Sequence, residues 1–329
     1  SLMAQASLRG IDSFTILSLP FFMFAGDIMR YGGVSEKLVN FAKRCFRNSI
    51  SALGNITVLA CAFFGAVSGS SAATVSATGG IMVPEMKNHH YKPEYATALA
   101  SAAGFLGILI PPSVPAVIYC CAAGVSVGKV FLAIIGPGVL TTIAFIILNR
   151  VLIKKNYDYE AAKKLEEAQQ YATEKSFFRA FIEALPAFLM PVIILGGIYS
   201  GIFTATEASA VAIIYGLVVS MFVYKKIGVK DIMPIAKESA LTAAKILLIM
   251  ATATFFGRVM TLLSLPQTIA TAITGISSNK IIILLLINVV LLILGMLMET
   301  GAAILLVTPI IYPTAKAVGV YPAHFGVIM

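Results

Sequence analysis

Apolar runs of roughly membrane-spanning length fill most of this chain, and short polar stretches separate them. The hydrocarbon core of a bilayer is crossed by about 20 apolar residues in an α-helix, and a helix satisfies all of its own backbone hydrogen bonds in lipid. The pattern therefore predicts an all-α polytopic membrane protein. Continuous spans are expected near residues 14–29, 131–153, 185–203, 208–224 and 241–263.

Three further apolar runs are interrupted in the middle. The run 52–86 is broken by Ser68-Gly69-Ser70-Ser71, and each half is short for a membrane span. Two short halves that are joined by small polar residues predict a re-entrant helical hairpin. The other two interruptions are Pro111-Pro112-Ser113 within the run 96–123, and Glu299-Thr300-Gly301 at the tip of a second predicted hairpin, 281–318.

The polar stretches differ in character. Residues 32–48 place apolar side chains at helical spacing among Lys and Arg, which predicts an amphipathic helix at the cytoplasmic surface. Residues 154–183 are the most polar part of the chain and mix both charge signs, which is typical of a solvated or interfacial helix. Residues 225–237 are expected to form a short linker before the span that begins near residue 241.

Composition favours a membrane protein over a soluble one. Hydrophobic residues make up 59% of the chain, charged residues 12%, and the mean hydropathy is +0.92, whereas a soluble domain is about 45–50% apolar and about 25% charged. The net charge of +9 resides in short loops between apolar runs, as the positive-inside rule requires, so nucleic acid is not expected as a partner. The four cysteines and three histidines lack metal-ligand spacing and are assigned no chemistry.

The chain carries a weak internal repeat with an offset of about 230 residues. Gly26-Asp27-Ile28-Met29 aligns with Gly257-Arg258-Val259-Met260, and Ser71-Ala72-Ala73 aligns with Gly301-Ala302-Ala303. If every basic stretch is cytoplasmic, the first hairpin enters from the cytoplasm and the second from outside. This arrangement predicts an inverted-topology repeat, whose matching interrupted helices mark a binding site.

The repeat divides the chain into two expected halves. Residues 1–153 form the first half, residues 154–183 connect the halves, and residues 184–329 form the second. Segments are expected to be missing at both ends, so that the C-terminal part of the second half is absent. Asp27 and Arg258 occupy equivalent positions near span ends, where each either pairs across the repeat or lies at the membrane interface.

The interruptions are the best candidates for chemistry. Non-helical backbone at membrane depth frees carbonyl oxygens, and hydroxyls add further hard oxygen ligands of the kind that sodium prefers. The prolines at 111 and 112 remove two amide donors and leave earlier carbonyls unpaired. The alternatives are close packing of small residues at 68–71, a simple kink at 111–113, and a helix cap at Glu299.

Four segments resemble one family of transporters. They are SGSSAATVSATGGIMVPEM (68–86), GILIPPSVPAVIY (107–119), IYSGIFTATEA (198–208) and LPQTIATAITGISSNKIIILLLINVVLLILGMLMETGAAILLVTPIIYP (265–313). Together they resemble the large membrane (M) subunit of tripartite ATP-independent periplasmic (TRAP) transporters, which are members of the ion-transporter superfamily. The resemblance covers essentially the whole chain. It departs at Ala205, where the family usually has Pro, and this puts one local turn in doubt.

The resemblance implies an elevator-type sodium symporter in the bacterial inner membrane. It implies two sodium sites, and these involve Ser68, Gly69 and Ser70, Pro111, Pro112 and Ser113, and Glu299, Thr300 and Gly301. The residues expected to face an acidic solute are Ser70, Ser71, Thr74, Ser113 and Thr300. A second proline-rich break, which would complete the second site, is expected beyond Met329.

The resemblance also implies partners and a substrate class. A small membrane (Q) subunit and a periplasmic substrate-binding (P) protein would accompany the chain in the lipid bilayer. The solute would be sialic acid or a C4-dicarboxylate, which the residues themselves do not distinguish.

The residues alone leave three other functions as alternatives. A proton-coupled carrier or a passive channel subunit would share the same apolar pattern. An intramembrane serine protease would need a base beside a serine such as Ser68, but no histidine lies within an apolar run. The chain is therefore not expected to be an enzyme.

Overall fold

The computed structural model describes residue 7 and residues 12–46, 50–157, 177–276 and 279–329. In this part of the chain almost every residue is helical, and the only β-type pairing is one isolated bridge between Tyr91 and Tyr157. Six of the described helices are long and apolar enough to cross a membrane, and a bent pair makes up to seven. The predicted all-α polytopic fold is therefore confirmed.

The long helices coincide with four of the five predicted spans. They are α10 (Val127–Asn156), α12 (Phe177–Tyr199), α13 (Ala205–Val218) with the π-helical turn η3 (Val219–Val223), and α14 (Val229–Leu262). The span expected at 14–29 is a 3-10 turn, η1 (Phe14–Leu17), followed by the short helix α2 (Ser18–Tyr31). Large apolar side chains such as Leu140 and Ile214 stay exposed on the long helices, which requires an apolar solvent around them.

The linker predicted over residues 225–237 is wrong beyond Gly228, because α14 begins at Val229. The Gly228 N–H donates to the Asp231 carboxylate at 2.7 Å, and this contact occupies one of the amide donors that a helix start leaves unpaired. Polarity alone suggested a loop, but the charged residues Lys230 and Lys237 lie on the exposed first turns of a 34-residue helix.

The first predicted hairpin is confirmed as two helical arms around a non-helical tip. Its arms are α4 (Ala52–Ser68) and the continuous α5 (Ser71–Thr74), π-helical η2 (Val75–Gly79) and α6 (Gly80–Asn88). The chain reverses at Gly69, whose φ of +63° lies in the left-handed region, where glycine has no steric penalty. The break thus falls where the small polar residues predicted it.

The predicted break at Pro111-Pro112-Ser113 is confirmed as well. The helices α7 (Pro93–Ala103), α8 (Leu106–Leu109) and α9 (Val114–Ala123) replace one continuous span, and the chain bends by 45° between α8 and α9. Two consecutive prolines remove amide donors that a helix would need at this point, and Ser113 then starts the next helix as its N-cap.

The second hairpin consists of α16 (Lys280–Leu297) and α17 (Thr300–Ala317). Its break is smaller than predicted, because only Met298 and Glu299 leave the helix and Thr300 and Gly301 begin α17. Glu299 is extended and accepts a hydrogen bond from the Ala302 N–H at 3.1 Å. Its carboxylate therefore caps the N-terminus of α17, and the helix begins at the next residue.

Shorter helices complete the described structure. The amphipathic helix expected at 32–48 is observed as α3 (Val34–Cys45), and its apolar face packs on α4 and α12. The helices α15 (Leu265–Ile276) and α18 (Pro322–Ile328) precede and follow the second hairpin. Of the polar helix expected at 154–183, residues 158–176 lie outside the described residues.

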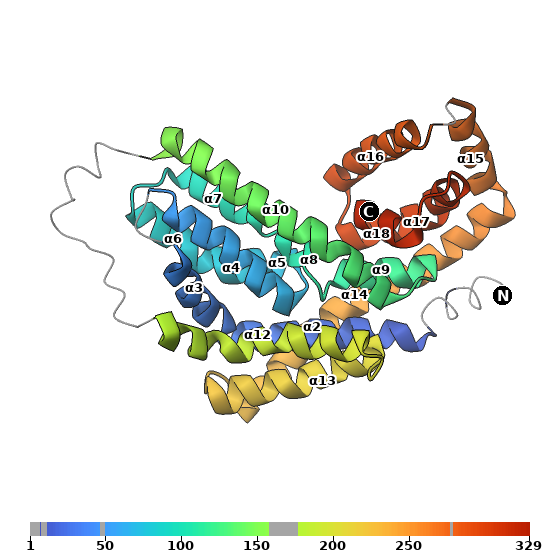
Figure 1. The fold of residues 1–329 in the computed structure, drawn as a ribbon. Coiled ribbons are helices and arrows are strands. Elements are labelled where there is room, and N and C mark those ends of the chain that lie inside the picture. The colour runs from blue at the N-terminus through green and yellow to red at the C-terminus, as the bar shows by residue number, and fades with distance from the viewer. Residues whose placement is uncertain (1–6, 8–11, 47–49, 158–176, 277–278) are drawn as a thin grey trace.

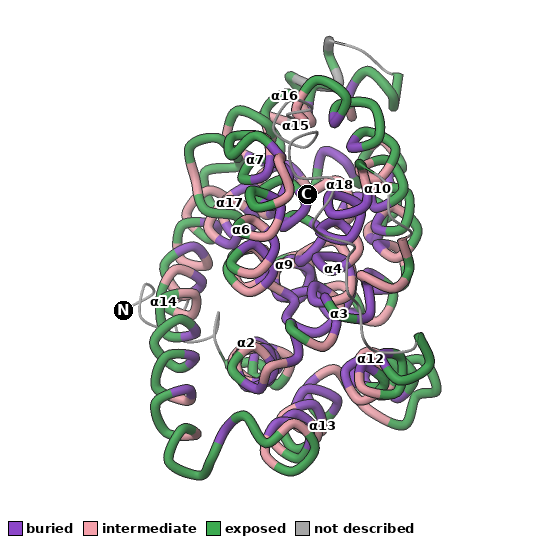
Figure 2. The backbone as a smooth tube through the Cα atoms, turned by 90° about the vertical axis from the view of Figure 1, so that its left-hand side faces the viewer, coloured by how far each residue is buried: buried purple, intermediate pink, exposed green. Residues whose placement is uncertain are grey.

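The helices form two groups around the middle of the molecule (Figure 1). In one group α2 packs between α13 and α14, with α12 against α13, and α14 continues far enough to pack on α17 of the other group as well. In the other group α4 packs on α7, α8 and α10, α17 packs on α9, and α18 packs on α10 and α9. Figure 2 shows many buried residues on α4, α9 and α18, and exposed residues along much of α14. The order of elements from α2 to α7 recurs from α14 to α18.

Candidate functional site

A cavity of about 330 Å³ lies between the two groups of helices. Residues of α2 and α14 form one wall, namely Met23, Gly26, Asp27 and Arg30 with Glu238, Thr242 and Ile246. The facing wall is made by the first hairpin tip, residues 68–73, together with Ile108 and the start of α9 at Val114, Pro115 and Ile118. The second hairpin tip completes the lining with Glu299, Thr300 and Gly301. Both predicted tips therefore face one space.

The first hairpin tip meets the proline break directly. The Val114 N–H donates to the Gly69 carbonyl oxygen at 3.1 Å, and a Cβ on Gly69 would lie only 2.7 Å from the Pro112 carbonyl oxygen. Pro111, Pro112 and Ser113 are buried. The structure thus brings together the residues that were predicted to form the first ion site.

Oxygen atoms cluster inside the first tip. The hydroxyls of Ser68 and Thr74 lie 3.1 Å apart, and the Thr74 hydroxyl donates to the Ser70 carbonyl oxygen at 2.8 Å. Ser68 and Thr74 are 4% and 0% exposed. Two hydroxyls and a carbonyl that converge away from water form a set of hard ligands of the type that alkali and alkaline-earth cations take.

Gly107 supports this cluster and was missed by the sequence analysis. A Cβ at Gly107 would lie 2.3 Å from the Thr74 hydroxyl oxygen and 2.6 Å from the Ser70 carbonyl oxygen. Only glycine therefore lets α8 approach the tip so closely. Its place four residues before the Pro-Pro break was the one available signal.

Two serines cap half-helices that start at the same crossing. The Ser70 hydroxyl accepts from the Ala73 N–H, and the Ser113 hydroxyl accepts from the Ala116 N–H, each at 3.4 Å. Two helix N-termini therefore begin side by side, and their partial positive charges favour an anion nearby. The Ser70 hydroxyl, which lines the cavity, keeps its own proton for donation to a ligand.

The second tip approaches α9 from the other side. A Cβ on Gly301 would lie 3.3 Å from Ile118 Cδ1, so this glycine permits a close contact between α17 and α9. Glu299 is exposed to the cavity and serves as the N-cap of α17. The capping alternative for Glu299 is thereby confirmed, and its role as an ion ligand stays a prediction.

The residues predicted to face the solute separate into two sets. Ser70, Ser71 and Thr300 line the cavity. Thr74 and Ser113 do not line it, and they are 0% and 1% exposed behind the first tip. In this arrangement the latter two are therefore shielded from a solute in the cavity.

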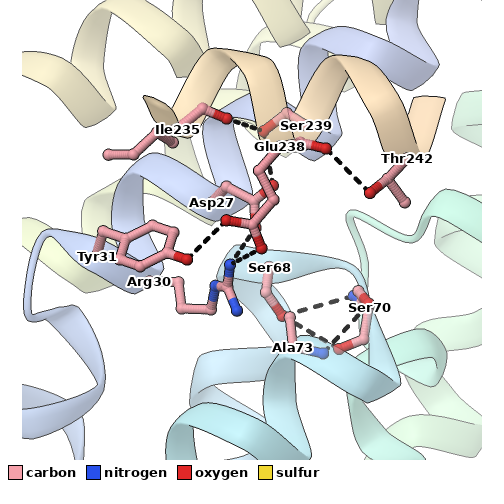
Figure 3. A network of polar contacts seen from close by, with 10 residues as sticks. All are labelled: Asp27, Arg30, Tyr31, Ser68, Ser70, Ala73, Ile235, Glu238, Ser239 and Thr242. Atoms are coloured by element: carbon pink, nitrogen blue, oxygen red, sulfur yellow. Dashed lines mark hydrogen bonds and ion pairs between the residues drawn. The ribbon is translucent and has the colours of Figure 1, made fainter. Parts of the chain in front are cut away.

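A charged network on the opposite wall was largely missed (Figure 3). Arg30 Nη2 lies 2.8 Å from Glu238 Oε1 and 3.3 Å from Asp27 Oδ1. The Tyr31 and Ser239 hydroxyls donate to Glu238 and Asp27, each at 2.6 Å. Of these residues only Asp27 belonged to a predicted motif, because the contact between α2 and α14 is not visible in the sequence.

Of the two alternatives stated for Asp27 and Arg258, pairing with the second half is observed for Asp27. Asp27 of the first half accepts a hydrogen bond from Ser239 of the second half. Arg258 is exposed on α14. In the described part of the chain, no three His, Cys, Asp or Glu side chains are close enough to hold a metal ion together.

Comparisons with known proteins identify the family of the chain. A family model described as "Tripartite ATP-independent periplasmic transporter, DctM component" matches residues 1–329. The isethionate TRAP transporter permease protein DctMQ of Oleidesulfovibrio alaskensis is 41% identical over 99% of this chain and 50% of its own length. The sialic acid TRAP transporter large permease protein SiaM of Vibrio cholerae is 38% identical over 99% of this chain and 74% of its own.

Two further similarities extend the comparison. The C4-dicarboxylate TRAP transporter large permease protein DctM of Pseudomonas aeruginosa is 39% identical over 97% of this chain and 73% of its own length. The crystal structure of the YdaH transporter of Alcanivorax borkumensis superimposes with a TM-score of 0.65 at 15% identity, over 98% of this chain and 74% of that one. This last likeness concerns the fold alone.

The chain spans half the length of the isethionate permease and about three quarters of the other two relatives. The family and these relatives are membrane permeases, so the predictions that the chain lies in the bacterial inner membrane and is not an enzyme are confirmed. The family match over all residues and the relatives of at least 38% identity show that the chain belongs to the DctM-component family of tripartite ATP-independent periplasmic transporters.

Proposed function

We propose that this chain is the substrate-translocating core of a sodium-coupled importer for an organic anion. The observation that carries the proposal is the convergence of two broken-helix tips, residues 68–71 and 299–301, on one cavity. Secondary transporters bind ions and solutes where interrupted helices from two repeats meet. A passive channel has no need of two such tips at one site.

The first sodium site is proposed at the tip of the first hairpin. Its ligands would be the hydroxyls of Ser68 and Thr74, the Ser70 carbonyl and the backbone around Gly69 and Pro112. These oxygens are close together and buried. Sodium has a net attraction to such a cluster because the oxygens replace its hydration shell. Ser113 and Pro111 would hold the backbone of this site in place.

The second sodium site is proposed at the tip of the second hairpin, with Glu299, Thr300 and Gly301. The Glu299 carboxylate faces the cavity, and cation binding would compensate its charge. The inverted relation between the two hairpins is part of this proposal. It is supported by the recurrence of the element order and by the two tips that face one space.

The solute class is proposed to be an organic anion of small to moderate size. Two half-helix N-termini capped by Ser70 and Ser113 favour negative charge at the cavity. The relatives are named for isethionate, sialic acid and C4-dicarboxylates, and all of these carry a sulfonate or carboxylate. Ser70, Ser71 and Thr300 would bind the solute.

An elevator-type movement is proposed for the group that carries the hairpins. The group of α2, α12, α13 and α14 would stay fixed, while both hairpins, α7–α10 and α18 would move together. The cavity between the groups supports this division. A periplasmic binding protein would deliver the solute and a small membrane subunit would support the fixed group.

Uptake by proteoliposomes tests the proposal. The full-length permease, with its small subunit and binding protein, would be assayed with isethionate, sialic acid and succinate, with and without an inward sodium gradient. Accumulation of one of them only with sodium is expected. Equal equilibration when potassium replaces sodium would contradict sodium coupling.

Proton coupling is the second candidate, because Asp27, Glu238 and Glu299 place three carboxylates around the cavity. Intramembrane carboxylates serve as proton carriers in many transporters. A pH gradient imposed without sodium distinguishes the two. Accumulation driven by the pH gradient alone would show that the coupling ion is the proton and would make these carboxylates its candidate carriers.

A further inference from the structure

We propose that Arg30 is a solute-binding residue, and that its guanidinium exchanges the Glu238 carboxylate for the anionic group of the solute. This inference rests on the proposed function and adds to it a specific anion contact on the α2 wall. Ser70, Ser71 and Thr300 would bind the solute from the hairpin side, and Arg30 would bind it from the fixed side.

Arg30 occupies the right place in the cavity. A Cβ on Gly26 would lie 2.8 Å from the Ser68 carbonyl oxygen, so α2 touches the first hairpin tip at Gly26. Arg30 lies four residues further along the same helix, and residues at this spacing share a helix face. Figure 3 shows its guanidinium between the carboxylate of Glu238 and the tip residues Ser68 and Ser70.

The charges around the cavity single out Arg30. Asp27, Glu238 and Glu299 are acidic, and Arg30 is the one cationic side chain among the described residues that line the cavity. These four residues sum to a formal charge of −2, from one positive and three negative groups. An organic anion entering this space therefore meets repulsion from three carboxylates, and Arg30 is the side chain that can offset it.

The Arg30 guanidinium has N–H donors that form no hydrogen bond within the described structure. Both of its carboxylate contacts use Nη2, and Nε is buried without a hydrogen-bond partner. A buried guanidinium N–H that lacks a partner is unfavourable, and a planar guanidinium prefers bidentate pairing with a carboxylate or sulfonate. The guanidinium therefore retains N–H donors for a bidentate partner that the protein itself does not supply.

Glu238 is suited to release Arg30. Its side chain is 49% exposed, whereas those of Arg30 and Asp27 are 20% and 18% exposed. Glu238 also accepts the Tyr31 hydroxyl at 2.6 Å, so it retains one partner when Arg30 turns to the solute. Asp27 keeps Arg30 on the wall during this exchange, and the Tyr31 ring lies 4.4 Å from the guanidinium carbon. The Glu238 carboxylate thus competes with the solute for the Arg30 guanidinium, and the solute displaces it.

The test uses the full-length permease with its small subunit. Sodium-dependent uptake in the presence of the binding protein is measured first with isethionate, sialic acid and succinate. The dissociation constant of the transported anion is then measured from its effect on thermal unfolding of the purified complex in sodium. The variants are Arg30→Gln, Arg30→Lys and Glu238→Gln. Lys37→Gln is the matched control, because Lys37 forms a part-buried ion pair with Glu183 at 3.0 Å outside the cavity lining.

Arg30→Gln is expected to raise the dissociation constant by about tenfold or more, since hydrogen bonds to charged groups are the strong ones. Arg30→Lys should fall between this variant and the wild type, because it keeps the charge without the bidentate fork. Glu238→Gln should lower the dissociation constant, since it removes the competing carboxylate. Loss of folding cannot produce a gain in affinity. If Arg30→Gln fails to fold, Glu238→Gln therefore still tests whether Glu238 competes with the solute for Arg30. Lys37→Gln should leave the dissociation constant unchanged.

The outcomes separate the inference from the proposed function. Sodium-dependent uptake by the wild type, with an unchanged dissociation constant in Arg30→Gln or in Glu238→Gln, would overturn the inference and leave the proposed function standing. Absence of uptake of all three anions by the wild type would overturn the proposed function, and the inference would fall with it.

Discussion

At the scale of single residues, Gly69 connects the local backbone to the site. Its φ of +63° reverses the chain between α4 and α5, and its missing side chain lets the first tip touch the Pro112 carbonyl. Its own carbonyl accepts from Val114. One residue therefore provides the turn, the close approach and the contact with the second broken helix.

Gly69→Ala is expected to destabilise the protein by about 2 kcal/mol or more, because an L side chain is strained at this φ and its Cβ would lie 2.7 Å from backbone. Thermal unfolding and uptake measure the effect. Gly80→Ala is the control, since no atom lies within 4 Å of its Cβ position and Ala favours a helix. Equal behaviour of the two variants would contradict the assigned role of Gly69.

Thr74→Val tests the first ion site at nearly constant volume. Loss of the hydroxyl that contacts Ser68 and Ser70 is expected to raise the sodium concentration for half-maximal uptake about tenfold, or about 1.4 kcal/mol. Sodium activation of uptake measures this shift. Thr141→Val is the control, because the Thr141 hydroxyl bonds only the Pro137 carbonyl of its own helix. An unchanged sodium dependence in Thr74→Val would remove Thr74 from the site.

At the scale of helices, a buried amide pair joins the first hairpin to α10. The Asn149 side chain donates to the Asn55 side-chain oxygen at 2.8 Å and accepts from the Tyr95 hydroxyl at 2.9 Å. Both asparagines are 1% exposed. A Cβ on Gly54 would lie 2.2 Å from Asn149 Oδ1, so α4 and α10 approach so closely here that only glycine fits at position 54. The base of the hairpin is therefore fixed to α7 and α10 as one unit.

Asn149→Leu is expected to lower stability by about 2 kcal/mol, since Asn55 and Tyr95 each lose a partner in a buried place. The midpoint of thermal unfolding in detergent gives the measurement. Asn156→Ala serves as the control, because the exposed Asn156 amide bonds only the Leu152 carbonyl of its own helix. A similar loss in both variants would indicate that the buried network contributes nothing of its own.

At the scale of the whole molecule, the cavity separates two groups of helices that carry different parts of the site. The α2 wall holds the charged network, and the hairpin wall holds hydroxyls and carbonyls. Tyr119 of α9 contacts both α17 and α18, since its ring lies 6.4 Å from that of Tyr312 and its hydroxyl donates to the Pro322 carbonyl at 2.8 Å. The proposed elevator movement treats the two hairpins as one moving body.

A cross-link across the cavity tests whether that body moves. Cysteines at Met23 and Ala72, on opposite walls, would be joined by a bifunctional thiol reagent with a disulfide in its spacer, after the four native free cysteines are replaced. Uptake should stop and return after reduction. A pair at Ala72 and Pro115, both on the hairpin side, should remain active when joined. Activity that persists across the first cross-link would contradict the elevator movement.

The sequence by itself determined the fold class and the positions of the breaks. Apolar runs of spanning length can satisfy their backbone in lipid only as helices, and Pro111-Pro112 and Ser68-Gly69 interrupt a helix by local sterics and lost donors. These effects act within a few residues, so the pattern along the chain was enough. The loop that local polarity predicted at residues 229–237 was wrong, because an exposed charged helix has the same composition as a loop.

The tertiary structure alone decided which residues share the site. Gly107 lies beside Thr74, Arg30 beside Glu238, and Ile118 beside Gly301, although up to about 208 positions separate such partners in the chain. Close packing of backbones and pairing of charges depend on the positions and angles at which helices cross. A single sequence does not reveal these positions or angles. The breaks are a local property of the chain, and the cavity that they line is a property of the packed whole.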